Sequence, residues 1–363
     1  MDFELPKRVL VTPRPEEQES IPGYLLRVAE ANGYPKFQWL ARAAGLRRID
    51  PFGGSGNLQL EALLNLEPGE IDGKFYGRTA VEGARDHVRF GNGTVHRFAI
   101  DLKRARICPL CLAEKGIARM AWDLAAVTVC PHHQCRLIDE CPTCKSPLTW
   151  SRDKLATCLH GHDLTQVEVM PASDPACGLG AVILEKAGLS NAAESNVEFA
   201  PAVERMKIAD ALDLTTFLGT WAIGRGGGQG RRVIRNLPLQ DRHAAFGAAA
   251  GILSEWPNRF YALLDNIRSN SEETQSRTGL EKEFGSLYTT LYSVSGGPPF
   301  ARFLKGPFET YVKKYWSGGY LTRKNSRFEH SGTDESRYAP IAGCTHRSSE
   351  ASSTLDTSQL CIV

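Results

Sequence analysis

The sequence lacks the features that would place it in a membrane or outside the cell. No apolar run approaches the roughly 18 residues of a membrane span, and the N-terminus, MDFELPKRVLVTPRP, has no hydrophobic core typical of a signal peptide. The formal net charge is only +2 over 363 residues, so any nucleic-acid-binding surface must be local. We therefore expect a cytoplasmic chain of two or three domains without a membrane partner.

The sequence also lacks a recognisable catalytic constellation. No nucleophile–base arrangement or carboxylate cluster stands out, and the helix-rich pattern does not offer the acidic set of a DDE transposase. The glycine-rich stretch GRGGGQGRR at 224–232 lacks the G-K-[S/T] ending of a phosphate-binding loop, so we interpret it as a flexible loop. An HNH-type nuclease is the main enzymatic rival, but the spare histidines lie in no recognisable motif: His87, His96, His132 and His162. We expect no enzyme.

Ten cysteines are what the sequence does contain. In a reducing cytoplasm they indicate metal ligands rather than disulfides, and no βαβ pattern supports a thioredoxin-like redox motif. Closely spaced pairs let two side chains of a tight turn reach one ion, and thiolates with imidazole select zinc. The sequence predicts two structural Zn²⁺ ions per chain, held by eight ligands in four pairs: Cys108 and Cys111, Cys130 and His133, Cys141 and Cys144, Cys158 and His160.

Three details of this ligand set are open in the sequence. CLHGHDL offers His160 or His162 as the last ligand, and we prefer His160. Cys135 is off the pattern, and we interpret it as a small buried side chain. Sequential pairing of the ligand pairs closes shorter loops than a crossed arrangement, so we favour it. Both predicted sets are complete with four protein ligands, which is typical of structural rather than catalytic zinc.

Helical periodicity dominates the rest of the chain, so the predicted fold class is mostly α with a small zinc-finger module of short strands. SIPGYLLRVAEANG (20–33) and KFQWLARAAG (36–45) read as two short helices, which could form half of a helix-turn-helix or only a packed αα-hairpin. Ser20 is the expected N-cap of the first. Further helices are predicted at LQLEALLNL (58–66), from Pro201 through Leu214, at LQDRHAAFGAAAGILSEW (239–256) and from Pro257, whereas MPASDPACG (170–178) is predicted as a loop. The aromatic stripe in PPFARFLKGPFETYVKKYW (298–316) indicates core. We predict an N-terminal helical segment (1–100), a tandem zinc-finger module (101–170), a C-terminal helical domain (171–322) and a disordered Ser/Thr-rich tail (323–363).

Two groups of basic residues could contact phosphate backbones. One precedes the first cysteine pair and the other surrounds the glycine-rich stretch, where a solvated surface is the alternative interpretation. The candidate nucleic-acid-binding residues are Lys103, Arg104, Arg106, Arg225, Arg231, Arg232 and Arg235.

The cysteine segment resembles the TniQ family of transposition proteins, which includes TnsD-like target-selection proteins. The resemblance is carried by the first three ligand pairs, by CLHG at 158–161, and by Trp122 and Leu137 between the pairs. ESIPGYLLRVAEANGY (19–34) is similar to the opening helix of the family, and EWPNRFYALL (255–264) to a later W-P-x-x-F segment. The likeness runs over roughly residues 5–320. His160 stands where the family usually has cysteine.

The resemblance implies a transposition accessory protein that selects or marks target DNA for an AAA+ ATPase and a DDE transposase. Some family members bind DNA directly and others bridge to a CRISPR RNA-guided effector complex, and homodimers are common. The Ser/Thr-rich tail differs from the family, in which helices often continue, so a truncated or frame-shifted end is considered beside a native one. A stand-alone zinc-containing DNA-binding regulator is the alternative function.

Overall fold

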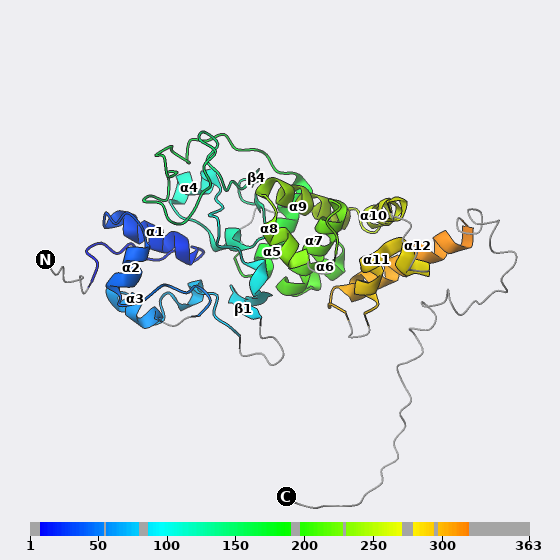
Figure 1. Ribbon diagram of the computed structural model, residues 1–363, viewed down its shortest axis with the longest axis horizontal. Coiled ribbons are helices and arrows are strands. Elements are labelled where there is room, and N and C mark those ends of the chain that lie inside the picture. The colour runs from blue at the N-terminus through cyan, green and yellow to red at the C-terminus, as the bar shows by residue number, and fades with distance from the viewer. Residues whose placement is uncertain are drawn as a thin grey trace, which may run out of the picture.

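The computed structural model describes residues 8–53, 56–79, 86–189, 197–227, 230–270, 279–293 and 297–318. Over these residues the fold is mostly helical with a few short strands, which confirms the mostly α part of the predicted class. In Figure 1, helices α1 to α3 lie at one end, α10 to α12 at the other, and α5 with α7 to α9 between them. No helix in the described ranges is both long and apolar enough to cross a membrane. The predicted disordered tail lies outside the described residues.

Helices α1 (Ile21–Ala31), α2 (Gln38–Ala43) and α3 (Asn57–Leu63) form the N-terminal end. They lie in the segments whose periodicity predicted helices. Asn32 caps α1 and Gly33 follows with a φ of 69°, a left-handed conformation that glycine adopts without strain. The apolar faces of these helices and of the 3₁₀ turn η1 (Asp72–Lys74) pack into a core cluster of their own. That cluster includes Leu25, Leu40 and Leu60.

A β-hairpin follows, formed by β1 (His87–Phe90) and β2 (Gly93–His96), with the 3₁₀ turn η2 (Arg97–Ala99) after it. Its tip lies against the end of α5 (Asp174–Lys186), because the Asn92 amide donates to the Ala187 carbonyl at 2.8 Å. A Cβ atom on Gly91 would lie 2.0 Å from that same oxygen. The close approach of two backbones therefore requires glycine at this position.

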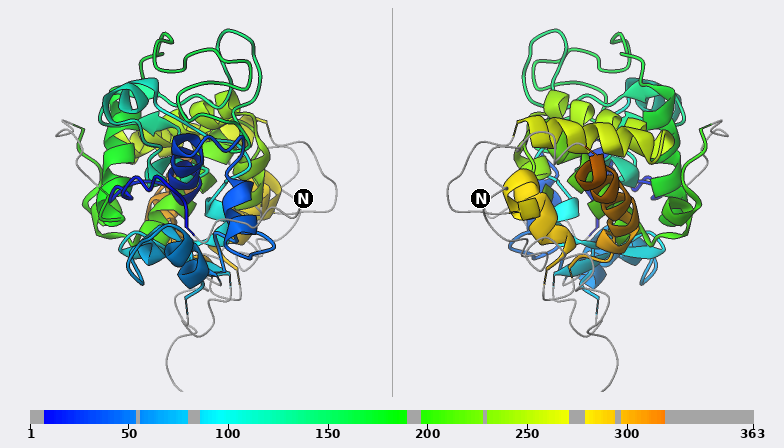
Figure 2. Two further views of the ribbon diagram at one scale, coloured as in Figure 1. Left: turned by 90° about the vertical axis from the view of Figure 1, so that its left-hand side faces the viewer. Right: turned by 90° about the vertical axis from the view of Figure 1, so that its right-hand side faces the viewer.

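The Cys/His segment contains little regular structure. It holds α4 (Pro109–Lys115), the 3₁₀ turn η3 (Met120–Asp123) and the two-residue strands β3 (Val129–Cys130) and β4 (Cys135–Arg136). The short strands of the predicted module are therefore present, as the antiparallel pair β3–β4. Long loops complete the segment and project from the helices in both views of Figure 2.

The central helices correct three details of the prediction. A single helix was expected to open at Pro201, but Met206 is extended, so α6 (Pro201–Arg205) ends there and α7 (Ile208–Ala222) starts anew. DPACG was expected in a loop, but it forms the first turns of α5. Part of the expected loop 224–232 belongs to α8 (Gly230–Asn236). Helix α9 (Leu239–Ser254) occupies its predicted segment and crosses α7 closely, where a Cβ on Gly219 would lie 2.5 Å from the Ala245 oxygen.

Three further helices complete the described chain: α10 (Asn258–Ser269), α11 (Gly279–Leu291) and α12 (Ala301–Gly318). The sequence reasoning did not predict α11. The aromatic stripe faces the core, as expected: Phe303 is partly buried, and the buried members are Phe300, just before α12, and Leu304, Phe308, Tyr311 and Val312 on it.

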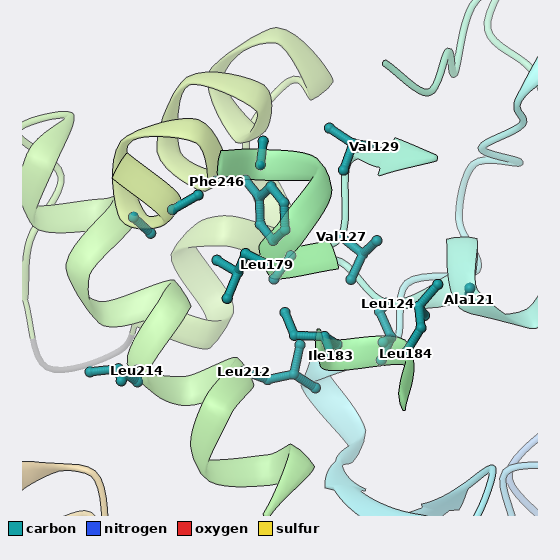
Figure 3. Close-up of a cluster of buried hydrophobic side chains, with 14 of the residues drawn as sticks. Ala121, Leu124, Val127, Val129, Leu179, Ile183, Leu184, Leu212, Leu214 and Phe246 are labelled. Carbon is teal, nitrogen blue, oxygen red and sulfur yellow. The ribbon is translucent and has the colours of Figure 1, made fainter. Parts of the chain in front are cut away.

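One hydrophobic core joins the Cys/His segment to the central helices. Figure 3 shows side chains of α5, α7 and α9 meeting side chains that lie between the first and second ligand pairs. Leu179 and Ile183 come from α5 and Phe246 from α9, and they lie near Val127 and Val129. The predicted boundary near residue 170 remains a prediction, and the buried cluster extends across it.

A buried carboxylate connects the N-terminal end to the Cys/His segment. Asp123 is only 3% exposed, and its Oδ2 atom accepts hydrogen bonds from the Ser20 hydroxyl at 2.6 Å and from the Tyr76 hydroxyl. Burial raises the pKa of Asp123 to about 6, although both hydrogen bonds oppose that rise. Ser20, predicted as the N-cap of α1, occupies that position without capping the helix through its side chain.

Asp123→Asn is expected to flatten the pH dependence of stability. The pKa of Asp123 is higher in the folded chain than in the unfolded one, so the folded chain binds its proton more tightly. The resulting contribution to the unfolding free energy is complete below about pH 4 and is lost as the pH rises through about 6. The wild type should therefore lose up to about 3 kcal/mol more unfolding free energy than Asp123→Asn between pH 4 and pH 7. Urea unfolding across that range measures the difference. Asp153→Asn, at an exposed position, is the control, and parallel curves for the wild type and Asp123→Asn would contradict the expectation.

Candidate zinc centres

The structure brings the first two ligand pairs together. The Sγ atoms of Cys108, Cys111 and Cys130 and a ring nitrogen of His133 all lie within 4.8 Å of one another. His133 Nδ1 is 3.2 Å from Cys111 Sγ and 3.5 Å from Cys108 Sγ. All three cysteines are buried, and the His133 side chain is 11% exposed.

Local backbone geometry explains how these four side chains converge. Cys108 is the N-cap of α4, where its Sγ accepts the Cys111 amide at 3.5 Å, and Pro109 starts the helix. Cys130 ends β3, and His133 lies in the turn that leads to β4, where Gln134 is left-handed with a φ of 50°. Backbone hydrogen bonds of 3.0 Å in both directions between Ile107 and Ile138 hold the two turns side by side.

Two further side chains contact the ligands of the first group. Glu114 Oε1 accepts a hydrogen bond from His133 Nε2 at 2.8 Å, which leaves Nδ1 facing the thiols. Arg119 Nε donates to Cys111 Sγ at 3.2 Å. Hydrogen bonds from Cys108, Cys130 and the Arg119 guanidinium lower the pKa of the Cys111 thiol, whereas the hydrogen bonds among the thiols raise the pKa of Cys108 and Cys130. Cys111 is therefore the thiol of this group that loses its proton most readily. The sequence reasoning missed both residues, although Glu114 follows Cys111 by one helical turn.

Glu114→Ala is expected to weaken zinc binding at the first group about 10- to 100-fold. A carboxylate that accepts the second N–H of a ligating histidine fixes its tautomer and raises its basicity. Competition with a chromophoric chelator measures the affinity. Glu114→Gln should be intermediate, because an amide oxygen still accepts the hydrogen bond but carries no charge. Glu168→Ala, at an exposed position, is the control, and equal affinities in all four proteins would exclude a role for Glu114.

The last two pairs form a second group with a different histidine from the one that we preferred. Cys141, Cys144, Cys158 and His162 have ligand atoms within 4.8 Å of one another. His162 Nδ1 is 3.3 Å from Cys158 Sγ. His160 is also near, with Nδ1 at 3.3 Å from Cys144 Sγ, but its side chain is exposed. Of the two histidines that the sequence left open as the last ligand, the structure therefore favours His162 over His160.

Tight turns again bring the ligands together. The Lys145 amide donates to the Cys141 carbonyl at 2.8 Å, and Lys145 is left-handed with a φ of 57°. The Cys158 amide donates to the His162 carbonyl at 3.0 Å, and Gly161, with a φ of 81°, closes that turn. The backbone bond across 158–162 directs the His162 side chain back toward the cysteines.

Histidine substitution at the second group distinguishes the two candidates. His162→Ala is expected to lower the zinc content from about two ions per chain toward one, because it leaves three thiols without a fourth protein ligand. His160→Ala is the matched control and should retain the full content. The zinc content is measured after gel filtration in a buffer that contains a weak chelator, which removes loosely bound zinc. The reverse pattern would restore His160 as the ligand.

Both groups fit a tetrahedral zinc ion. Ligand distances of about 2.0–2.3 Å from the metal correspond to separations of roughly 3.3–3.8 Å between ligand atoms. The separation is 3.6 Å between the Sγ atoms of Cys111 and Cys130 and 3.8 Å between those of Cys144 and Cys158. Three thiols and one imidazole in each group form a donor set that selects zinc. Each group takes consecutive ligand pairs, in the sequential order that we favoured. Cys135 is buried outside both groups, with Sγ 3.5 Å from Cys108 Sγ.

Four of the seven predicted nucleic-acid contacts interact with acidic residues or backbone carbonyls of the fold. Arg106 is 3% exposed and donates to the Ala125 and Asp101 carbonyls, so it is not available to a phosphate, which corrects that prediction. Arg231 pairs with Asp213. Arg235 is 3.8 Å from Asp101, and Arg104, whose side chain is exposed, is 3.4 Å from Asp139. Arg232, Arg225 and Lys103 are exposed, and Arg232 lies over the Phe98 ring.

Asp101 neutralises the buried arginines next to the first group. Its carboxylate accepts Arg242 at 2.9 Å and the Lys103 amide at 3.1 Å. Burial would raise the pKa of Asp101, but the positive charges of Arg106 and Arg242 keep it below its usual value. Burial in turn lowers the pKa of Arg106 to about 10, so that this guanidinium stays charged at neutral pH.

Comparison with known families relates part of the chain to one of them. The sequence profile of the TniQ family matches residues 10–137. This segment of the chain is therefore similar to the TniQ family. The TniQ segment contains α1 to α4 and the whole first ligand group, whereas the second group and the helices from α5 onward lie beyond it. A search among curated proteins gives no match.

Proposed function

We propose that this chain is a non-enzymatic accessory protein of transposition that helps select or mark target DNA. The TniQ segment over residues 10–137 is the observation that carries the proposal. In this proposal the protein acts beside an AAA+ ATPase and a DDE transposase, and it engages the target either by binding DNA itself or through a CRISPR effector complex.

The two zinc groups support an architectural role for the metal. With zinc bound, four protein ligands would complete each tetrahedron and leave no coordination position for a water or a substrate. Zinc bound there would supply folding free energy, because the loops around it have little regular structure of their own. The ligands we propose are Cys108, Cys111, Cys130 and His133 for one ion, and Cys141, Cys144, Cys158 and His162 for the other.

Co-purification tests the function directly. The tagged full chain is expressed with the genes that flank it, and the recovered proteins are identified by mass spectrometry. We expect an AAA+ ATPase and a DDE transposase among them, with loss of targeted insertion when the chain is deleted. Normal insertion without this chain would refute the proposal. Recovery of specific DNA alone, with no transposition protein, would favour the stand-alone regulator.

A further inference from the structure

We propose that the surface around α2 binds the phosphodiester backbone of nucleic acid and stacks an unpaired base. This α2 surface consists of Lys36, Trp39, Arg42, Arg47 and Arg48. All five side chains are exposed, and none belongs to the residues predicted from the sequence. The inference rests on the proposed function, since it names one surface through which such a protein would engage a target.

The cations of the α2 surface are not neutralised by acidic side chains in the described residues. Between Glu30 and Asp50 the sequence contains four cations and no acidic residue. Across the described ranges, none of the ion pairs involves any of these four cations. Arg106, Arg231 and Arg235 differ in this respect, because carboxylates or carbonyls of the fold already hold their guanidinium groups.

Trp39 is a large aromatic side chain that lies at the surface of the N-terminal end and not in its core. Its neighbours Leu40 and Ala41 are buried and complete the N-terminal core, whereas Trp39 is 42% exposed. The Arg42 guanidinium lies 5.3 Å from the centre of the Trp39 ring. An aromatic ring beside an arginine is the arrangement on which proteins stack unpaired bases while they bind the adjacent phosphates.

The dimensions of the surface suit a nucleic-acid strand. Helix α2 has six residues, which corresponds to about 9 Å, and the remaining cations flank it directly. That length is close to three steps of about 3.4 Å along one strand of a duplex. Gly45, with a φ of 71°, ends the helix and turns the chain toward Arg47 and Arg48. The Gln38 side chain donates to Ser151 Oγ at 3.0 Å, so the loops of the second zinc group lie beside the surface.

Purified full-length, zinc-loaded protein and labelled oligonucleotides test the inference without any transposition partner. The triple variant Arg42→Gln, Arg47→Gln, Arg48→Gln is expected to bind a duplex about tenfold or more weakly than wild type. The dependence of log affinity on log salt should fall by about one per arginine. The matched control removes three exposed cations elsewhere, with Arg205→Gln on α6 and Arg302→Gln and Lys313→Gln on α12, and should retain most of the affinity.

Trp39→Ala separates stacking from charge. It should lower affinity for a single strand about fivefold or more and leave duplex affinity nearly unchanged. Parallel titrations with DNA and RNA strands identify which nucleic acid the surface takes. Equal binding by the triple variant and its control would overturn the inference, and so would a wild type that binds no nucleic acid. If the same arginines bound polyglutamate more tightly than nucleic acid, the inference would be overturned, and an acidic protein would be the partner of this surface. Co-purification of the ATPase and transposase tests the proposed function separately, so the two can fail independently.

Discussion

Replacing Cys108 with serine is expected to remove one zinc ion and to make the protein insoluble. Cys108 contributes a thiol to the first ligand group and is also the N-cap of α4. Structural zinc supplies an apparent binding free energy of about 10–16 kcal/mol in small zinc domains. That exceeds the total stability of most domains. The segment that carries this group also provides Val127 and Val129 to the central core, so its unfolding would expose α5 and α9.

Two matched variants make this prediction specific. Cys141→Ser should also lose one zinc ion, with a milder loss of solubility, because the second group lies on projecting loops (Figure 2). Cys177→Ala, on α5 and outside both groups, should retain about two zinc ions per chain. Zinc content, far-UV circular dichroism and the soluble fraction are the measurements. A soluble, folded Cys108→Ser protein with both ions would show that the ligand assignment is wrong.

Asp101→Asn is expected to destabilise the fold by about 3–5 kcal/mol. The substitution keeps the shape of the side chain but removes the negative charge that faces Arg106 and Arg242, both of which are buried. A buried cation without its counterion loses hydration and gains little in return. Urea unfolding at neutral pH measures the effect.

The control for this prediction is an ion pair of the same type at the surface. Glu255→Gln breaks the pair with Arg259, in which both side chains are more than half exposed, and should cost no more than about 1 kcal/mol. A similar small loss for Asp101→Asn would mean that water reaches the buried arginines.

The ligand pairs could be predicted because their chemistry depends on local spacing. Two cysteines separated by two residues form one turn wherever the chain places them, so the first group needed no knowledge of the fold. The choice between His160 and His162 was different. It depends on the backbone bond from the Cys158 amide to the His162 carbonyl, which spacing alone does not reveal.

The role of each arginine could not be predicted for a related reason. Arg106 and Arg47 both lie in short basic stretches of the sequence, yet the fold buries the first and exposes the second. Arg106 donates to the Asp101 carbonyl nearby in the chain, and the Asp101 carboxylate in turn pairs with Arg242 far away on α9. Counting charges along the chain cannot detect a network that closes only when α9 packs on the Cys/His segment.

The break between α6 and α7 shows the limit of periodicity. Val203 and Leu214 fit one apolar stripe, and no proline or glycine separates them. The chain is nevertheless extended at Met206, because tertiary packing outweighs the modest helix propensity of any single residue. Glycine 219 had a comparable hidden role, since only the crossing of α7 with α9 explains the absence of a side chain there.

The core shared between the Cys/His segment and the central helices has a practical consequence for dissecting the protein. A fragment that starts at residue 171 would keep α5, α7 and α9 but would leave Leu179, Ile183 and Phe246 without the side chains that cover them in Figure 3. Water would meet that apolar surface, and the fragment would self-associate. The helices and the first zinc group are therefore best treated as a single unit of expression, and activities are best mapped by point substitution within the whole chain.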